Sequence, residues 1–263
     1  MDLGIDGNTA LVTASSSGLG KASARAMARE GANVVINGRN QEKLEAAAAE
    51  LDETATGKVI GVQGDLTDKN DIENLVATAV EEFGSIDHLI TSAGGPPGGS
   101  FMDMEDEDWY QAFDILVMSV VRIVRETLPY LREGEGGTIV TLTSRSVKEA
   151  LENLVLSNSV RMSVIGLMKT LSQELAPEIR VNAILPGPHE TDRMKELIEN
   201  GVEQGRFDSY QQGLNSFNAA VPLKRLGDPQ ELGDTAAFLS SQKSSYINGT
   251  ALVVDGGGSS SNL

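Results

Sequence analysis

Short apolar runs alternate with amphipathic helical segments along nearly the whole of this 263-residue chain. The runs have the length of strands, and the segments between them have the spacing of helices with one apolar face. The strand-like runs are 9–14, 33–37, 58–65, 87–94, 136–144, 179–187 and 250–257, and the helical segments are 18–32, 41–53, 71–84, 106–134, 156–169, 190–219 and 228–241.

This alternation predicts a parallel sheet covered by helices on both faces, because strands buried on both sides show near-continuous apolar runs. Crossovers between parallel strands are right-handed, which gives a doubly wound fold. No linker or repeat interrupts the pattern, so we expect one domain over residues 1–263. The segment 188–219 is the least core-like, being rich in charged residues and in Asn and Gln, and we interpret it as a candidate substrate lid.

The first apolar run leads into a glycine-containing stretch, "TASSSGLGKA", residues 13–22. Gly18 and Gly20 open a helix directly after a strand, where missing Cβ atoms let a pyrophosphate approach the N–H groups of the helix N-terminus. The stretch is not a Walker A loop, since it lacks the first glycine of that motif and a Ser or Thr after Lys21. It predicts a nucleotide site, although many α/β turns contain glycine for backbone reasons alone.

With these features the chain resembles the short-chain dehydrogenase/reductase family over nearly its whole length. The family pattern T-G-x-x-x-G-x-G corresponds to residues 13–20, with Ala14 in place of the first glycine. The family motif N-N-A-G corresponds to "TSAG" at 91–94, and the strand-six signature corresponds to "RVNAILPGPHET" at 180–191. The resemblance implies a single doubly wound Rossmann-type α/β domain, with a seven-stranded parallel sheet and helices on both faces.

The resemblance also implies a nicotinamide cofactor that supplies hydride. Gly38 ends the second strand, where an NAD-preferring relative often has an acid, and Arg39 follows it. A guanidinium there pairs with a 2′-phosphate, which favours NADP over NAD; a solvated loop arginine is the alternative. The residues expected to contact the cofactor are Thr13, Ser15, Ser17, Gly18, Leu19, Gly20, Arg39, Asp65, Leu66, Ala93, Gly94, Arg161, Pro186, Gly187 and Thr191.

Family members use a serine to orient the carbonyl, a tyrosine to transfer the proton, a lysine to hold the ribose and an asparagine to support a water relay. Ser144 fills the serine slot at the end of "TIVTLTS". Ser157 stands in the tyrosine slot, and Arg161, one helical turn later, stands in the lysine slot. The register follows the family spacing Y-x-x-x-K-x-x-x-x-G-x-x-K, whose glycine and last lysine are present. Leu116 falls in the asparagine slot.

These replacements remove the proton donor of the family. A phenol has a pKa of about 10 that a nearby cation lowers, whereas a serine hydroxyl is a far weaker acid and needs a base or a relay. Arg161 shares a helix face with Ser157 and keeps the positive charge, but Leu116 relays no protons. His189, near the expected nicotinamide position, is the candidate rescue donor, with an exposed loop histidine as the alternative; His88 is expected to be structural.

The composition narrows the class of partner. The chain has 38 acidic and 21 basic residues and a net charge of −17, which disfavours binding to nucleic-acid phosphates. It has no cysteine, no membrane-length apolar run and no basic leader, so we expect no metal site, no membrane insertion and a cytoplasmic location. Charge of this size is typical both of salt-adapted proteins and of ordinary acidic enzymes.

Two functions remain open from the sequence. The first is an NAD(P)-dependent oxidoreductase acting on a small-molecule carbonyl or alcohol, most like the 3-oxoacyl-[acyl-carrier-protein] reductase branch, with altered proton-transfer residues. The second is a catalytically silent relative that binds a nucleotide or ligand as a regulator or scaffold. The resemblance implies a homotetramer or homodimer, and the apolar runs 115–121 and 164–168 are the expected interface.

Overall fold

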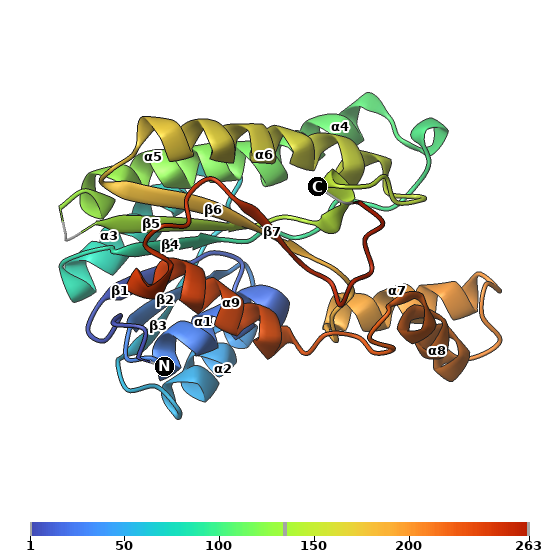
Figure 1. Ribbon diagram of the computed structural model, residues 1–263, viewed down its shortest axis with the longest axis horizontal. Coiled ribbons are helices and arrows are strands. Elements are labelled where there is room, and N and C mark those ends of the chain that lie inside the picture. Colours follow the sequence, from blue (N-terminus) through green and yellow to red (C-terminus); the bar gives the residue numbers. More distant parts are fainter. Residues whose placement is uncertain (1, 134–135, 262–263) are drawn as a thin grey trace.

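The computed structural model describes residues 2–133 and 136–261, which form a single α/β domain (Figure 1). Its parallel sheet has seven strands within this part of the chain, in the order β3-β2-β1-β4-β5-β6-β7. The fold class and the strand-like runs of the sequence are therefore confirmed. The strands are β1 (Thr9–Val12), β2 (Asn33–Gly38), β3 (Val59–Gln63), β4 (His88–Thr91), β5 (Gly137–Leu142), β6 (Ile179–Pro186) and β7 (Ala251–Val254).

Helices cover both faces of the sheet, because successive strand residues point to opposite sides. On one face, Leu11 and Leu89 pack with helices α3, α5 and α6; on the other, Val12 and Ile90 pack with α1, α2 and α9. Every one of these four side chains is fully buried. The helices are α1 (Gly18–Arg29), α2 (Gln41–Asp52), α3 (Lys69–Phe83), α4 (Asp106–Phe113), α5 (Ser119–Leu131), α6 (Val155–Glu174), α7 (Asp192–Glu203), α8 (Tyr210–Ala220) and α9 (Pro229–Ser240).

The long helix expected over 106–134 is interrupted. Helices α4 and α5 are separated by a π-helical turn, Asp114–Met118, in which the backbone hydrogen bonds span one residue more than in an α-helix. Leu116 lies in this turn with its side chain buried in the core. The expected end of the helix at residue 134 lies outside the described residues, and α5 ends at Leu131.

The apolar runs expected at an interface are partly buried inside the protomer. Leu116, Val117 and Val120 of the first run, and Val164 and Met168 of the second, belong to the core on one face of the sheet. These buried side chains are not available for subunit contacts, whereas the partly buried and exposed residues of the two runs are. Assembly into dimers or tetramers remains a prediction.

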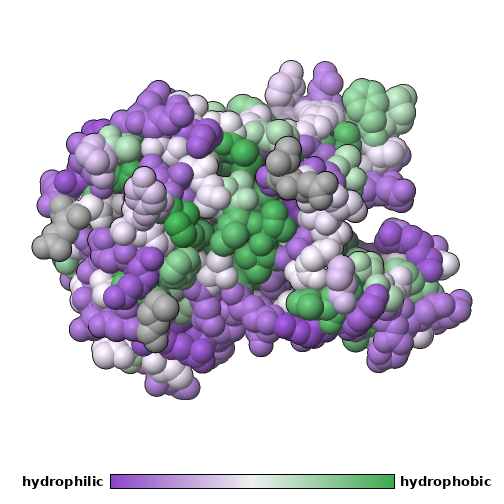
Figure 2. Space-filling view, viewed as in Figure 1, coloured by the Kyte–Doolittle hydropathy of each residue, from purple (hydrophilic) through white to green (hydrophobic). Residues whose placement is uncertain are grey.

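The candidate lid, 188–219, contains α7 and extends into α8. The two helices project from the sheet as a separate pair and contact each other, with Phe207 and Phe217 in an edge-to-face arrangement (Figure 1). The surface is hollowed between this pair and α4 (Figure 2). The segment therefore borders an opening, as a lid would, and its movement remains a prediction. Within the described residues, no helix is long and apolar enough to cross a bilayer.

His88 is a structural histidine, as expected. It is buried; its Nε2 lies 3.0 Å from the Asn8 amide nitrogen, and its Nδ1 lies 2.8 Å from Thr138 Oγ1. The Asn8 amide donates to Nε2, so the neutral ring carries its proton on Nδ1 and donates it to Thr138. A second proton, on Nε2, would break the bond with Asn8. Burial lowers the pKa to about 4, with opposing effects of the charges of Asp87, which raises it, and Arg180, which lowers it.

This depressed pKa makes stability depend on pH. The imidazole binds its proton near pH 6.5 in the unfolded chain and near pH 4 in the folded protein. The contribution of neutral His88 to the free energy of unfolding is therefore complete above pH 6.5 and is lost as the pH falls through 4. We expect the free energy of unfolding, measured by urea denaturation, to fall by about 2 kcal/mol between about pH 7 and pH 5. The variant His88→Gln should show a flatter profile in this interval; an equal slope in both proteins would contradict the assignment.

Candidate functional site

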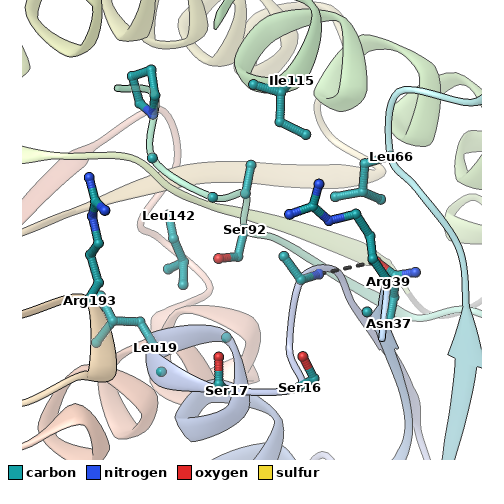
Figure 3. Close-up of a pocket in the computed structure, with 18 of the residues that line it drawn as sticks. Ser16, Ser17, Leu19, Asn37, Arg39, Leu66, Ser92, Ile115, Leu142 and Arg193 are labelled. Atoms are coloured by element: carbon teal, nitrogen blue, oxygen red, sulfur yellow. Dashed lines mark hydrogen bonds between the residues drawn. The ribbon is translucent and has the colours of Figure 1, made fainter. Parts of the chain in front are cut away.

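A cleft of about 840 Å³ lies at the carboxyl ends of the strands. It is centred where the strand order reverses, since β1 pairs with both β2 and β4. Open α/β sheets bind ligands at such a switch point. Its walls come from the glycine turn before α1, the ends of β2 to β6, the 94–97 loop, the π turn, and the start of α7 (Figure 3).

The glycine turn is built for a close approach of a ligand to backbone. Ala14 has φ +45° and Gly18 has φ +58°, both in the left-handed region. A Cβ on Gly20 would lie 2.6 Å from the Ala14 carbonyl oxygen, so only glycine fits where α1 meets the turn. Ser17 precedes α1 without capping it through its side chain, and the residues of the first turn border the cleft. This is the arrangement that binds phosphate oxygens.

Two residues expected to contact the cofactor support the turn instead of bordering the cleft. Thr13 Oγ1 donates to the Ser92 carbonyl at 2.8 Å and accepts from its N–H at 2.9 Å. Ser15 Oγ donates to the Val12 carbonyl at 2.6 Å and accepts from the Asn37 N–H at 3.0 Å. Both hydroxyls are therefore occupied by backbone partners.

Asn37 is a site residue that the sequence reasoning missed. Its buried side chain accepts from the Ala14 N–H at 3.3 Å and donates to the carbonyls of Val62 and Gly64, at 3.2 and 3.1 Å. It therefore ties the glycine turn to the end of β3 while bordering the cleft (Figure 3). The only sequence signal was a polar residue near the end of an otherwise apolar run.

One end of the cleft is formed by Arg39 and Asp65. Arg39 Nη1 lies 4.0 Å from Asp65 Oδ2, and the arginine side chain is 80% exposed. Although burial raises the pKa of Asp65, hydrogen bonds from Thr67 and the charge of Arg39 lower it overall. A Cβ on Gly38 would lie 2.9 Å from Ser16 Oγ, so an acid at this position would first have to displace Ser16.

Most of the other expected cofactor contacts border the cleft, namely Ser17, Gly18, Leu19, Gly20, Leu66, Ala93, Gly94, Pro186 and Thr191. Thr191 caps α7 by accepting from the Met194 N–H at 3.3 Å. Gly187 does not border it: a Cβ there would lie 2.4 Å from the Asp255 Cβ, so this glycine permits close packing of the chain after β7. The cleft walls also contain residues that the sequence reasoning did not select, including Gln111, Asp114, Ile115 and Arg193.

Ser144 and Ser157 are near each other in the fold but do not border the cleft. Ser144 precedes a 3₁₀ turn, Arg145–Val147, and its Oγ accepts from the Ser146 N–H at 3.1 Å. The Oγ atoms of Ser157 and Ser146 are 3.1 Å apart and share a buried hydrogen bond. Ser146 thus bridges the two serines, and the hydroxyl in the tyrosine slot is directed to it.

Arg161 does border the cleft, one helical turn after Ser157. Its side chain is only 9% exposed, and its Nε is buried without a hydrogen-bond partner among the described residues. Burial lowers the pKa to about 10, with no carboxylate of the described chain opposing the shift. The guanidinium is therefore charged at neutral pH and lacks a counter-ion.

His189 is not brought to the cleft. Its ring is buried, with Nδ1 3.0 Å from the Gly187 carbonyl oxygen, and it borders a separate cavity of about 140 Å³. Arg225 and Glu231 border the same cavity and are paired with each other at 2.6 Å. The residue is thus neither the exposed loop histidine nor a donor to the main cleft, because the chain after Pro186 directs it into the smaller cavity.

Comparison with known proteins indicates the family to which the chain is related. The family model described as enoyl-(acyl carrier protein) reductase matches residues 13–259. The chain is 34% identical over 258 residues to dehydrogenase/reductase SDR family member 4 of Bos taurus, covering 96% of this chain and 88% of that protein. It is 32% identical over 256 residues to a 3-oxoacyl-[acyl-carrier-protein] reductase of Thermotoga maritima, covering 96% and 98% respectively.

A similar solved structure is that of L-sorbose reductase from Gluconobacter frateurii, complexed with NADPH and L-sorbose. It superimposes with a TM-score of 0.94 at 32% sequence identity, covering 99% of this chain and 100% of that one. The similarity therefore extends over the whole domain. On the family match, the sequence identity and the shared fold, the chain belongs to the short-chain dehydrogenase/reductase family.

Proposed function

We propose that the protein is an NADPH-dependent oxidoreductase that reduces the carbonyl group of a small molecule, or oxidises the corresponding alcohol. The observation that best supports this is one continuous cleft that joins the Arg39 end, the glycine turn and Arg161. L-sorbose reductase, whose solved structure is similar to that of this protein, was complexed with NADPH. The Thermotoga maritima relative suggests 3-oxoacyl compounds as a second substrate class.

The cleft residues fit such a cofactor. The N–H groups around Gly18 and Gly20 would hold the pyrophosphate, and Arg39 would pair with the 2′-phosphate of the adenosine ribose. Pro186 and Thr191 border the end where the nicotinamide would lie, and Arg161 would donate to ribose hydroxyls. The bound cofactor would supply the hydride. Because Ser157 is hydrogen-bonded to Ser146, the alcohol oxygen would take its proton from water.

The Arg39 role predicts a cofactor-specific loss. We expect Arg39→Ala to weaken NADPH binding by about 10- to 100-fold, because a charge-assisted pair with the 2′-phosphate is lost. NADH, which has no 2′-phosphate, should bind within about twofold of the original affinity. Both affinities are measured by cofactor fluorescence titration.

The control for this prediction is Arg29→Ala, which removes an equal charge from the exposed end of α1. It should change neither affinity. Equal weakening of NADPH and NADH by Arg39→Ala would contradict the proposed contact, and no binding of either cofactor to the unmodified protein would contradict the proposed function.

A second candidate is a catalytically silent relative that binds ligands. It is favoured by one observation, that the hydroxyl in the tyrosine slot is engaged by Ser146 and does not border the cleft. NADPH binding without oxidation by any carbonyl compound would support this candidate.

A further inference from the structure

We propose that the cleft selects a carbonyl compound that also carries a carboxylate, and that Arg161 binds this carboxylate. The proposal deepens the proposed function, since it rests on a reducible carbonyl in the same cleft. It adds the chemical class of the substrate, an oxo acid, and assigns its recognition to a residue that replaces the lysine of the family.

The state of Arg161 points to an anionic ligand. The residue is only 9% exposed, its Nε is buried without a partner among the described residues, and no described carboxylate compensates its charge. A buried, unpaired cation is unfavourable in a folded protein unless something neutralises it. Because Arg161 borders the cleft, a ligand in the cleft can supply the missing partner.

Arg161 is accessible from the cleft. Ser157 stands in the tyrosine slot, and its Oγ is hydrogen-bonded to Ser146 Oγ, 3.1 Å away. The short side chain leaves out the aromatic ring that a tyrosine would place one helical turn before Arg161. Among the described residues, Arg161 is the charged group that α6 contributes to the cleft.

The other charged side chains of the cleft wall already have partners of opposite charge. Asp114 is paired with Arg122 at 2.7 Å, and Asp192 is paired with Lys195 at 3.2 Å. Arg39 lies 4.0 Å from Asp65, and Arg193 lies 3.5 Å from Glu196. Within the described part of the chain, Arg161 is therefore the charge of the cleft that lacks a counter-ion, and it attracts an anion most strongly.

A carboxylate matches these features better than a neutral group. It forms two parallel hydrogen bonds with a guanidinium and neutralises its charge, whereas ribose hydroxyls accept hydrogen bonds but leave the charge uncompensated. A guanidinium has five N–H donors, so Arg161 can hold ribose hydroxyls and a carboxylate together. In the reaction, the carbonyl carbon accepts hydride and its π bond to oxygen breaks. The oxygen takes a proton from water and leaves hydroxide, NADPH is oxidised to NADP⁺, and the carboxylate is unchanged.

The test compares three oxo acids with their methyl esters: pyruvate, acetoacetate and 4-oxopentanoate. Binding is measured by calorimetry with and without NADPH, and by fluorescence of Trp109, the single tryptophan, on α4. We expect at least one acid to bind about 100-fold more tightly than its ester, equivalent to about 2.7 kcal/mol. Arg161→Gln should abolish this difference, and Arg161→Lys should retain much of it. Equal binding of acid and ester in all three pairs would overturn the proposal.

Thermal unfolding gives a second, independent measurement. Without ligand, Arg161→Gln should raise the melting temperature by about 4 °C, because an uncompensated buried charge is removed. The matching acid should stabilise the original protein but not this variant. A lower melting temperature for Arg161→Gln, together with unchanged acid binding, would count against the proposal. If esters and acids are reduced equally with NADPH, the proposed function stands and the oxo-acid inference fails. If acids bind to Arg161 and NADPH does not bind, the carboxylate site stands and the proposed function fails.

Discussion

Replacing Leu116 with asparagine, Ser157 with tyrosine and Arg161 with lysine together is expected to raise the NADPH-dependent reduction of a neutral ketone by at least about 100-fold. The gain comes from a phenol that can donate its proton to the developing alkoxide, in place of a serine hydroxyl that is engaged by Ser146. Lysine beside the phenol lowers the phenol pKa, and Leu116→Asn places an amide in the π turn at the position of the family asparagine.

The rate is measured as the decrease of NADPH absorbance with a ketone that has no carboxylate. The same three replacements in a Ser144→Ala background serve as the control. This protein should gain little if Ser144 has the carbonyl-orienting role that the family serine would have at this position. Ser144→Ala alone should abolish any turnover of the unmodified protein. An unchanged rate in the triple variant would favour the ligand-binding candidate over the oxidoreductase.

Gly20→Ala should destroy the cofactor site. Its Cβ would lie 2.6 Å from the Ala14 carbonyl oxygen and 3.1 Å from the Ser15 Cα, and both atoms belong to the backbone of the turn. The turn has to move away from α1, at a cost of about 3 kcal/mol in the free energy of unfolding. NADPH affinity should fall at least about 100-fold, because the N–H groups that would hold the pyrophosphate lose their positions.

The matched control is Gly166→Ala in α6, where a Cβ would meet nothing within 4 Å. Alanine has the higher helix propensity, so this variant should gain about 0.5–1 kcal/mol of stability and leave NADPH affinity unchanged. Urea denaturation and fluorescence titration check both variants. Comparable stabilities for Gly20→Ala and Gly166→Ala would show that the turn relaxes and that the packing argument is wrong.

Local signals in the sequence were sufficient for the fold. The run "TALV" has adjacent apolar residues, and in the structure Leu11 and Val12 fill the cores on opposite faces of the sheet. Gly18 and Gly20 marked the glycine turn, and the family spacing identified Arg161 as a residue of the cleft. These features depend on neighbours in the chain, so periodicity and spacing predict them.

Tertiary structure decided the features that the sequence did not predict. The helix expected over 106–134 contains a π turn, and about half of the residues in the apolar runs assigned to an interface are buried within the domain. Ser157 bonds to Ser146 instead of facing the cleft, and His189 borders a different cavity. The core burial, the second cavity and the Ser146–Ser157 bond each join segments that are separated along the chain and become neighbours only after folding.

The sequence by itself determined the strand and helix pattern, the glycine turn, and the presence of an arginine at position 161. Only the tertiary structure decided that this arginine is buried beside the cleft with no carboxylate of the described chain to pair it. The physical reason is that a residue type specifies a charge, whereas the packing of distant segments specifies its solvent and its counter-ion.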